Sequence, residues 1–505
     1  MSARAWTATL SGVDGVVVEI EADTSAELPG ALPRDMPGPE WREVTERVRA
    51  ALRHSYESWP ARHVALAVSP AVGVPASPGG DLAFAAAVLA ADGRVPQDSL
   101  GDTVLLGALA PDGRVCGVRG VLPALLVAHR AGFERAIVPA QMLAEAALVP
   151  GVEVLGATDL AAVLGWLRGH ADSLRRAPYP VAAPNTRQPD LTEVTGRPHA
   201  RWALEVAAAG GHSLAFIGRP GSGTTLLAAQ LPGLLPPLSP DEAMQVTAIH
   251  SAAGLLTPDA PRIETRPFVA PHHTCSLAAL IGGGRGVPRP GVLSRAHHGV
   301  LLMDSVAEFG PQRLSAVRAA LDTGQVCLAG RHGSTRFPAG CHLIAAATPC
   351  PCAAPVERDC TCRPRAVDRY RERLGTALLD RVDLHVPLPP AARGARVEQE
   401  PHSTATVAAR VDAARQRAAH RWAHCGARSN AEAPGSVLWR SALPPAVTEP
   451  LQAALRRGSI SSRAAEQTLR IAWTLADLSH DERPHAEHAA AARALRRGLH
   501  PGESG

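Results

Sequence analysis

The stretch Gly218-Arg-Pro-Gly-Ser-Gly-Thr-Thr225 decides the fold of this chain. It has the spacing of a phosphate-binding loop, G-x-x-x-x-G-K-[ST], but Thr224 stands where the lysine belongs. The apolar run 214–217 predicts a buried parallel strand before the loop, and residues 226–231 predict a helix after it. Strand, glycine-rich turn and helix let backbone N–H groups bind phosphate. We therefore expect a nucleotide-binding α/β domain. The expected nucleotide contacts are Gly218, Gly221, Ser222, Gly223, Thr224 and Thr225.

A second apolar run, residues 299–303, ends in Asp304 and predicts a strand beside the strand that precedes the loop. At the carboxyl end of such a strand, the Asp304 carboxylate and the Thr225 hydroxyl are placed to bind the Mg²⁺ of a bound nucleotide. The two runs together predict a bound nucleotide with Mg²⁺, and the family resemblance described below implies that this nucleotide is ATP.

Length, charge and the longest apolar run limit which classes of protein this chain can belong to. The chain has 505 residues, enough for several domains, and 46% of them are hydrophobic. There is no lysine, so all 51 cationic side chains are arginines, and the net charge of +4 permits nucleic-acid contact without arguing for it. The longest apolar run, residues 82–91, is too short to span a membrane, and the N-terminus lacks a signal-peptide core. We expect a cytoplasmic protein with no membrane partner.

The chain divides into four segments by composition. Residues 1–168 alternate apolar strands with alanine-rich helices, and residues 169–189 form a linker rich in Pro, Ala and Arg. Residues 190–395 contain the phosphate-binding loop, and residues 396–505 read as a helical domain.

The sequence resembles magnesium-chelatase-like AAA+ ATPases of the ComM/YifB type, almost from end to end. The stretches that carry the resemblance are LPGLLPPLS (231–239), TAIHS (247–251), RPFVAPHHT (266–274), PRPG (288–291), AHHGV (296–300) and LLDRVDLH (378–385). The resemblance implies an α/β protein with a Lon-protease-C-like domain, an AAA+ P-loop core and a C-terminal helical lid. It also implies hexameric rings and, for ComM-type members, a DNA-remodelling role in recombination.

Three residues depart from the family pattern. Thr224 replaces the P-loop lysine, Ser305 replaces the glutamate after the Walker B aspartate, and Thr348 replaces the sensor 1 asparagine. A charged hydrogen bond is worth about 1.5–3 kcal/mol, so losing the lysine should weaken ATP binding by about one to two decades. A positioned base accelerates catalysis by about 10²–10⁴-fold, and serine cannot serve as one. Glu308 is a poor substitute, because the family has a glutamate there as well. We expect weak binding and little hydrolysis, which leaves open whether the chain is an ATPase.

Two arginines match family positions that act on a neighbouring subunit's nucleotide. Arg381 matches the arginine finger, and Arg463 resembles the sensor 2 arginine. We expect a homo-oligomer, or a mixed ring in which this chain lends Arg381 to an intact paralogue. A working ATPase motor with unusual catalytic residues is a rival. A subunit that inserts Mg²⁺ into a porphyrin is another, although the N-terminal segment argues against it.

Four of the nine cysteines form the pattern C-x-C…C-x-C, namely Cys350, Cys352, Cys360 and Cys362. Four thiolates on two short loops suit a structural, tetrahedral Zn²⁺ site, and the alternative is two reduced thiol loops. The remaining cysteines are expected to be buried small residues. They are Cys116, Cys275, Cys327, Cys341 and Cys425.

A Lon-type peptidase needs a serine nucleophile and a lysine base. Leu122 falls where the base belongs, Gly80 stands at the serine position, and Ser77 has no partner, so we expect no proteolysis. A long insert, residues 251–295, is expected to face a ring pore, where basic side chains would meet DNA phosphates. Its basic candidates are His272, His273, Arg285, Arg289 and Arg295.

Overall fold

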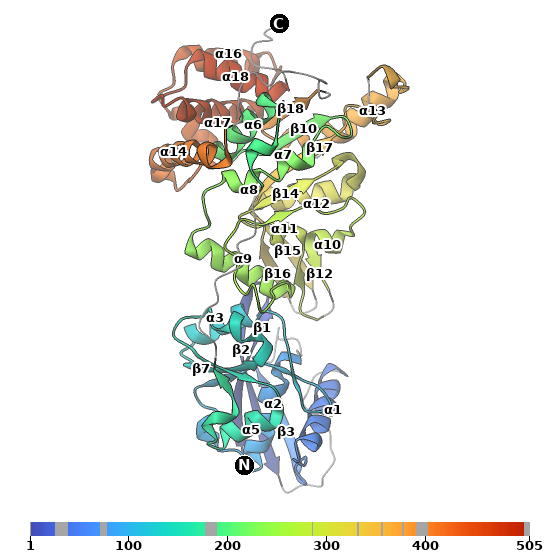
Figure 1. Ribbon diagram of the computed structural model, residues 1–505, viewed down its shortest axis with the longest axis vertical. Helices are drawn as coiled ribbons and strands as arrows, with labels where there is room; N and C mark the ends of the chain where they lie inside the picture. The colour runs from blue at the N-terminus through green and yellow to red at the C-terminus, as the bar shows by residue number, and fades with distance from the viewer. Residues whose placement is uncertain are drawn as a thin grey trace.

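The computed structural model shows an elongated molecule with three parts stacked along its long axis (Figure 1). The N-terminal part lies at one end, the phosphate-loop part in the middle and the C-terminal helices at the other end. The structure describes residues 2–25, 39–70, 78–176, 189–284, 286–330, 333–354, 357–375, 378–389 and 402–498. The calls on Ser77 and Arg285 therefore lie outside the described residues, as does the predicted boundary at 395/396.

The N-terminal part is a mixed sheet with the strand order β3-β2-β1-β4-β7-β8-β9 among the described residues. The strands are β1 (Ser2–Ser11), β2 (Asp14–Ser25), β3 (His63–Ser69), β4 (Thr103–Leu105), β7 (Arg135–Pro139), β8 (Glu153–Ala157) and β9 (Arg175–Arg176), with a small ribbon of β5 (Ala108–Leu109) and β6 (Val115–Cys116). The helices are α1 (Pro39–His54), α2 (Asp81–Ala91), α3 (Val121–Arg130), α4 (Leu143–Ala146) and α5 (Leu160–Leu167). Because β9 pairs antiparallel with β8, Arg175 and Arg176 of the predicted linker belong to this sheet.

The middle part contains the sheet β11-β14-β17-β10-β18, in which every neighbouring pair is parallel. Its strands are β10 (Leu214–Gly218), β11 (Phe268–Val269), β14 (Val300–Met303), β17 (His342–Ala347) and β18 (Leu384–Leu388). The helices around it are α6 (Pro198–Gly210), α7 (Thr224–Ala228), α8 (Leu231–Leu234), α9 (Pro240–Ala253), α10 (Leu277–Ile281), α11 (Val292–Arg295), α12 (Gly310–Thr323) and α13 (Pro364–Gly375). Two ribbons complete it, β12 (Gly282–Gly283) with β13 (Arg289–Pro290) and β15 (Gln325–Gly330) with β16 (Gly333–Pro338). This arrangement is consistent with an AAA+-like α/β core.

The predicted strand at 214–217 is confirmed as β10, whose central residue Phe216 is fully buried. The predicted helix at 226–231 is wrong in its extent, because it forms two short helices, α7 and α8. Pro232 explains the break: it has no N–H to donate to the carbonyl of Ala228, and its ring would clash with that carbonyl.

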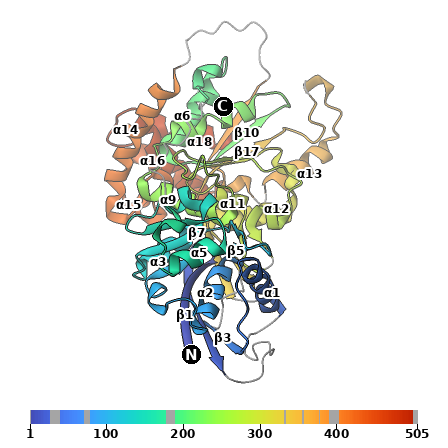
Figure 2. The ribbon, with the colours of Figure 1, turned by 60° about the horizontal axis from the view of Figure 1, so that its bottom comes forward.

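The C-terminal part is helical, as predicted, with α14 (Thr404–Trp422), α15 (Gly435–Arg440), α16 (Pro445–Arg456), α17 (Ser462–Leu478) and α18 (Ala486–Arg497). Figure 1 and Figure 2 both place α14 and α13 on opposite sides of the core sheet. Among the described residues, no helix has the length and apolar character that a membrane span requires.

A buried polar network joins this helical part to the core. The Asp477 carboxylate is fully buried and accepts hydrogen bonds from the Arg421 guanidinium and, at 2.8 Å, from the Asn430 amide. The same amide donates to Thr474 at 3.1 Å, and the Thr474 hydroxyl lies 2.8 Å from Nε2 of His212. Since His212 lies two residues before β10, the network reaches the strand that leads into the phosphate-binding loop.

Candidate functional site

The loop between β10 and α7 has the backbone that phosphate binding requires. Gly221 and Gly223 have φ angles of +79° and +83°, in the left-handed region that favours glycine. Gly218 is needed for space, since a Cβ there would lie 2.6 Å from the Ser222 hydroxyl and 2.9 Å from the Leu388 Cβ. Backbone conformation or lack of space thus favours glycine at each of the three positions.

The sheet brings the predicted site residues together. Asp304 follows β14 and Thr348 follows β17, and these strands lie next to each other with β10 on the far side of β17. Because the strands are parallel, their carboxyl ends meet at one edge, where ligands bind in such sheets. A pocket of about 430 Å³ opens there. It is lined by residues 218–226 of the loop together with Asp304, Ser305, Ala346, Ala347 and Thr348.

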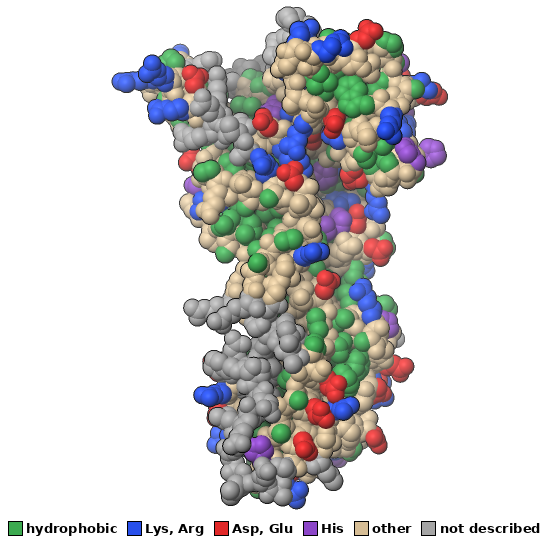
Figure 3. Space-filling model, turned by 180° about the vertical axis from the view of Figure 1, so that it is seen from behind, with side chains coloured by type: hydrophobic (Ala, Val, Ile, Leu, Met, Phe, Trp, Pro, Cys, Tyr) green, Lys and Arg blue, Asp and Glu red, His purple; other side chains and the backbone are tan. Residues whose placement is uncertain are grey.

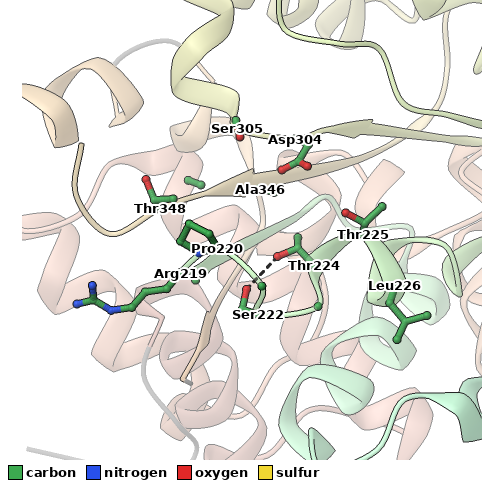
Figure 4. A pocket seen from close by; sticks show the side chains of 14 residues that line it. Arg219, Pro220, Ser222, Thr224, Thr225, Leu226, Asp304, Ser305, Ala346 and Thr348 are labelled. Carbon is green, nitrogen blue, oxygen red and sulfur yellow. Dashed lines mark hydrogen bonds between the residues drawn. The ribbon is translucent and has the colours of Figure 1, made fainter. Parts of the chain in front are cut away.

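Most polar side chains that line this pocket carry hydroxyl or carboxylate oxygens, and positive charge is scarce. The Thr224 hydroxyl lies 3.2 Å from the Ser222 hydroxyl, so it offers a neutral hydrogen bond where a lysine would offer a charge. Among the described lining residues, Arg219 carries the one cationic side chain. Figure 4 shows that it extends away from Asp304 and Thr224. Its guanidinium donates to the carbonyl of Ala354.

The donor set fits a magnesium nucleotide. The exposed Asp304 carboxylate and the exposed Thr225 hydroxyl are the hard oxygen ligands that Mg²⁺ prefers. Ser305, with a φ of +53°, turns the chain sharply after Asp304. Glu308 is exposed but is absent from the described residues that line the pocket, which agrees with its interpretation as a poor substitute base.

Two residues that contact the predicted site residues escaped sequence reasoning. The hydroxyl of Tyr370, on α13, lies 2.8 Å from the Thr348 hydroxyl, and burial raises the pKa of Tyr370. Nothing in the sequence links these two residues, which are 22 positions apart. The second is Asp322 on α12, which forms an ion pair with Arg381 and lies 3.8 Å from Arg463. Neither arginine is among the described residues that line the pocket of its own chain.

The four clustered cysteines come together as the sequence predicted. Their sulfur atoms all lie within 4.8 Å of one another. The Cys350–Cys352 distance is 3.5 Å, and Cys360 lies 3.6 Å from each of these two sulfurs. Zinc–sulfur bonds of about 2.3 Å in a tetrahedron put the sulfurs about 3.8 Å apart, so the spacing suits one metal ion. The prediction for the dispersed cysteines is wrong for Cys327, which is exposed on a two-stranded ribbon. The other four are partly buried, and three of them pack against the hydrophobic cores, namely Cys275, Cys341 and Cys425.

The basic candidates of the insert divide between surface and interior. His272 and Arg289 are exposed, whereas Arg295 is partly buried and its carbonyl lies 3.0 Å from Nε2 of His250. The rings of His272 and His273 pack 4.1 Å apart.

Comparisons with known proteins identify the family to which this chain belongs. Residues 190–396 match the family described as "Magnesium chelatase, subunit ChlI". Residues 401–496 match "Magnesium chelatase, subunit ChlI C-terminal", and residues 20–142 match "Subunit ChlI of Mg-chelatase". YifB of Escherichia coli is 34% identical and Competence protein ComM of Haemophilus influenzae is 32% identical, each over 96% of both chains. The chain belongs to the magnesium-chelatase-like family of YifB and ComM. An uncharacterised protein of Mycobacterium tuberculosis, Rv2897c, is 46% identical over 98% of both chains.

Membership of the YifB and ComM family agrees with the chemistry of the pocket. The matches to the three ChlI families cover most of the N-terminal part, the core and the helical part, so the resemblance extends over most of the chain. The family is in general dependent on ATP and Mg²⁺, which is the chemistry that the pocket's oxygen ligands suit.

Proposed function

We propose that this chain is an AAA+ ATP-binding protein of the ComM type that binds Mg²⁺–ATP weakly and hydrolyses it slowly. One observation carries the proposal: the pocket keeps the glycine backbone, Thr225 and Asp304, yet has Thr224, Ser305 and Thr348 where the family has Lys, Glu and Asn. The retained groups bind phosphate and metal. The replaced groups are those that neutralise charge and orient the attacking water.

The proposal includes a ring, with a hexamer as the expected form, and a role in remodelling DNA. Arg381 and Arg463 support the ring, because both lie outside their own pocket and share the partner Asp322 at one place on the chain. Exposed arginines support DNA contact. Arg363 lies just before α13 and Arg365 in its first turn, and both are exposed. Figure 3 shows arginines gathered on the projecting arm at the upper left of that view. For the N-terminal part we propose a Lon-C-like scaffold without proteolysis, since Gly80 and Leu122 offer no catalytic groups.

A mixed ring is the second candidate. Here the chain would hydrolyse nothing itself and would supply Arg381 to the nucleotide of an intact paralogue. The observation that favours it is the combination of a degenerate pocket with both trans-acting arginines retained. ATP turnover measured on the chain alone and on a mixture with an intact homologue separates the two candidates. Stimulation that disappears with Arg381→Ala supports the mixed ring, whereas an unchanged homologue rate rejects it.

The metal ligand Asp304 gives a direct test of nucleotide binding. Asp304→Asn is expected to raise the Kd for Mg²⁺–ATP by about 10–100-fold, because it removes a charged oxygen ligand. Glu308→Gln is the matched control, since this carboxylate is exposed, lies close in sequence and does not line the pocket. Calorimetric titration with and without Mg²⁺ measures both. No detectable Mg²⁺–ATP binding by the unaltered chain would refute the proposal.

We also propose that the four clustered cysteines hold one structural Zn²⁺. Elemental analysis of protein purified under reducing conditions is expected to give about one zinc per chain. Cys352→Ser should remove most of this zinc, whereas Cys327→Ser, an exposed cysteine outside the cluster, should leave it unchanged. Zinc-free wild-type protein, or equal loss in both variants, would rule out the assignment.

A further inference from the structure

The loop that carries the four cysteines, residues 350–362, is connected to two walls of the nucleotide pocket. The Arg219 side chain, from the phosphate-binding loop, donates to the carbonyl of Ala354. The Thr348 hydroxyl, at the end of β17, donates to the carbonyl of Cys350 at 2.9 Å. Both donors line the pocket, and both acceptors lie in the cysteine loop. The shape of the cysteine loop therefore bears on the position of two pocket residues.

The described residues of the cysteine loop have little regular secondary structure. They form one 3-10 turn, Glu357–Asp359, and no other helix or strand. Cys350 and Ala354 are buried, whereas Pro351, Cys352 and Thr361 are exposed, so apolar burial holds only part of the loop. Ala353 has a φ of +49°, a conformation that is unfavourable for a residue with a Cβ and persists where its surroundings impose it. A metal that joins Cys350 and Cys352 to Cys360 and Cys362 would impose it.

We propose that zinc in the cysteine loop fixes the geometry of the nucleotide pocket. Arg219 and Thr348 are the positioning residues that connect the two. This inference rests on the proposed zinc site and the proposed nucleotide binding. A metal-bound loop presents the Ala354 carbonyl at a fixed place, and Arg219 anchors the phosphate-binding loop to it. Without the metal, the carbonyl is no longer fixed and the phosphate-binding loop loses its anchor. More of the ordering entropy of this loop then opposes nucleotide binding.

Removal of zinc tests the coupling. A soft-donor chelator that leaves Mg²⁺ in solution is expected to raise the Kd for Mg²⁺–ATP about tenfold, a loss comparable with one charged hydrogen bond. Cys352→Ser should do the same, and Cys327→Ser should not. Arg219→Ala is the decisive variant, because it removes the hydrogen bond between the phosphate-binding loop and the Ala354 carbonyl and leaves the four cysteines intact. It should retain about one zinc per chain, bind Mg²⁺–ATP more weakly, and show no further loss when zinc is removed.

Hydrogen exchange supplies a readout that does not depend on ATP. Amides of residues 218–225 should exchange faster after zinc removal in the wild type, and equally fast with and without zinc in Arg219→Ala. Zinc-bound protein whose Kd and exchange stay unchanged after zinc removal would overturn the inference while leaving the zinc site and nucleotide binding in place. Faster exchange in a protein that fails to bind ATP would support the coupling and refute only the proposed nucleotide binding. Protein without zinc as purified would overturn the coupling together with the metal site.

Discussion

Thr224→Lys combined with Ser305→Glu is expected to raise the rate of ATP hydrolysis by about 10²–10⁴-fold over the unaltered chain. Lysine restores a charge next to the phosphates, and glutamate restores a base for the attacking water. The pocket has the geometry to use both, because position 224 opens α7 and position 305 directly follows Asp304, the proposed Mg²⁺ ligand. Turnover with saturating ATP measures the effect.

The two substitutions should act on different quantities. Thr224→Lys alone should lower the Kd for Mg²⁺–ATP by about 10–100-fold, because it adds a charged hydrogen bond where Thr224 now contacts Ser222. Ser305→Glu alone should leave the Kd nearly unchanged, because it acts on the chemical step. Ser334→Lys, an exposed position on the β15–β16 ribbon, controls for added charge. Tighter binding without faster turnover in the double variant would contradict the assignment of position 305 as the place where the catalytic base is missing.

Asp477→Ala is expected to destabilise the helical part by about 3–5 kcal/mol, the usual cost of breaking a buried ion pair. The carboxylate is fully buried, and its loss leaves the Arg421 guanidinium, which is 18% exposed, without its anion. It also removes an acceptor from the Asn430 amide. Hydrogen exchange of α17 amides reports the local free energy of opening.

The control for this variant lies on the same helix. Glu466→Ala breaks the pair with Arg470 one helical turn away, where the two side chains are 30% and 18% exposed. Pairs of this kind contribute about 0–1 kcal/mol, so α17 should stay protected. Equal losses in Asp477→Ala and Glu466→Ala would show that the buried network has no special role in holding the helical part together.

Local patterns in the sequence predicted the core of the site well. The strands that end at Gly218 and near Asp304 are short apolar runs, and the glycines between residues 218 and 223 have a spacing that few structures other than a phosphate-binding loop require. The clustering of the four cysteines was equally predictable, because two C-x-C pairs separated by a short spacer can meet without help from the rest of the fold. Membership of the family was also evident from the sequence, and the comparisons confirm it.

Contacts between distant segments were not predictable in the same way. Asp322 and Tyr370 are ordinary helix residues in the sequence, and only the fold brings them to Arg381 and Thr348. The short strand β9 was assigned to a linker because two arginines carry no strand pattern. Cys327 was expected in the interior, yet its side chain points outward from a two-stranded ribbon that leaves one face open.

If the proposed ring forms, the contacts of Asp322 with Arg381 and Arg463 bear on the free energy of its assembly. Within one chain, Asp322 already neutralises Arg381 and lies near Arg463. If these arginines reach a neighbour's triphosphate, ring closure exchanges one anionic partner for another and creates little new attraction. In such a ring, a subunit whose neighbour holds no nucleotide would have no electrostatic reason to release these arginines, and the occupancy of one pocket would govern whether the adjoining interface closes.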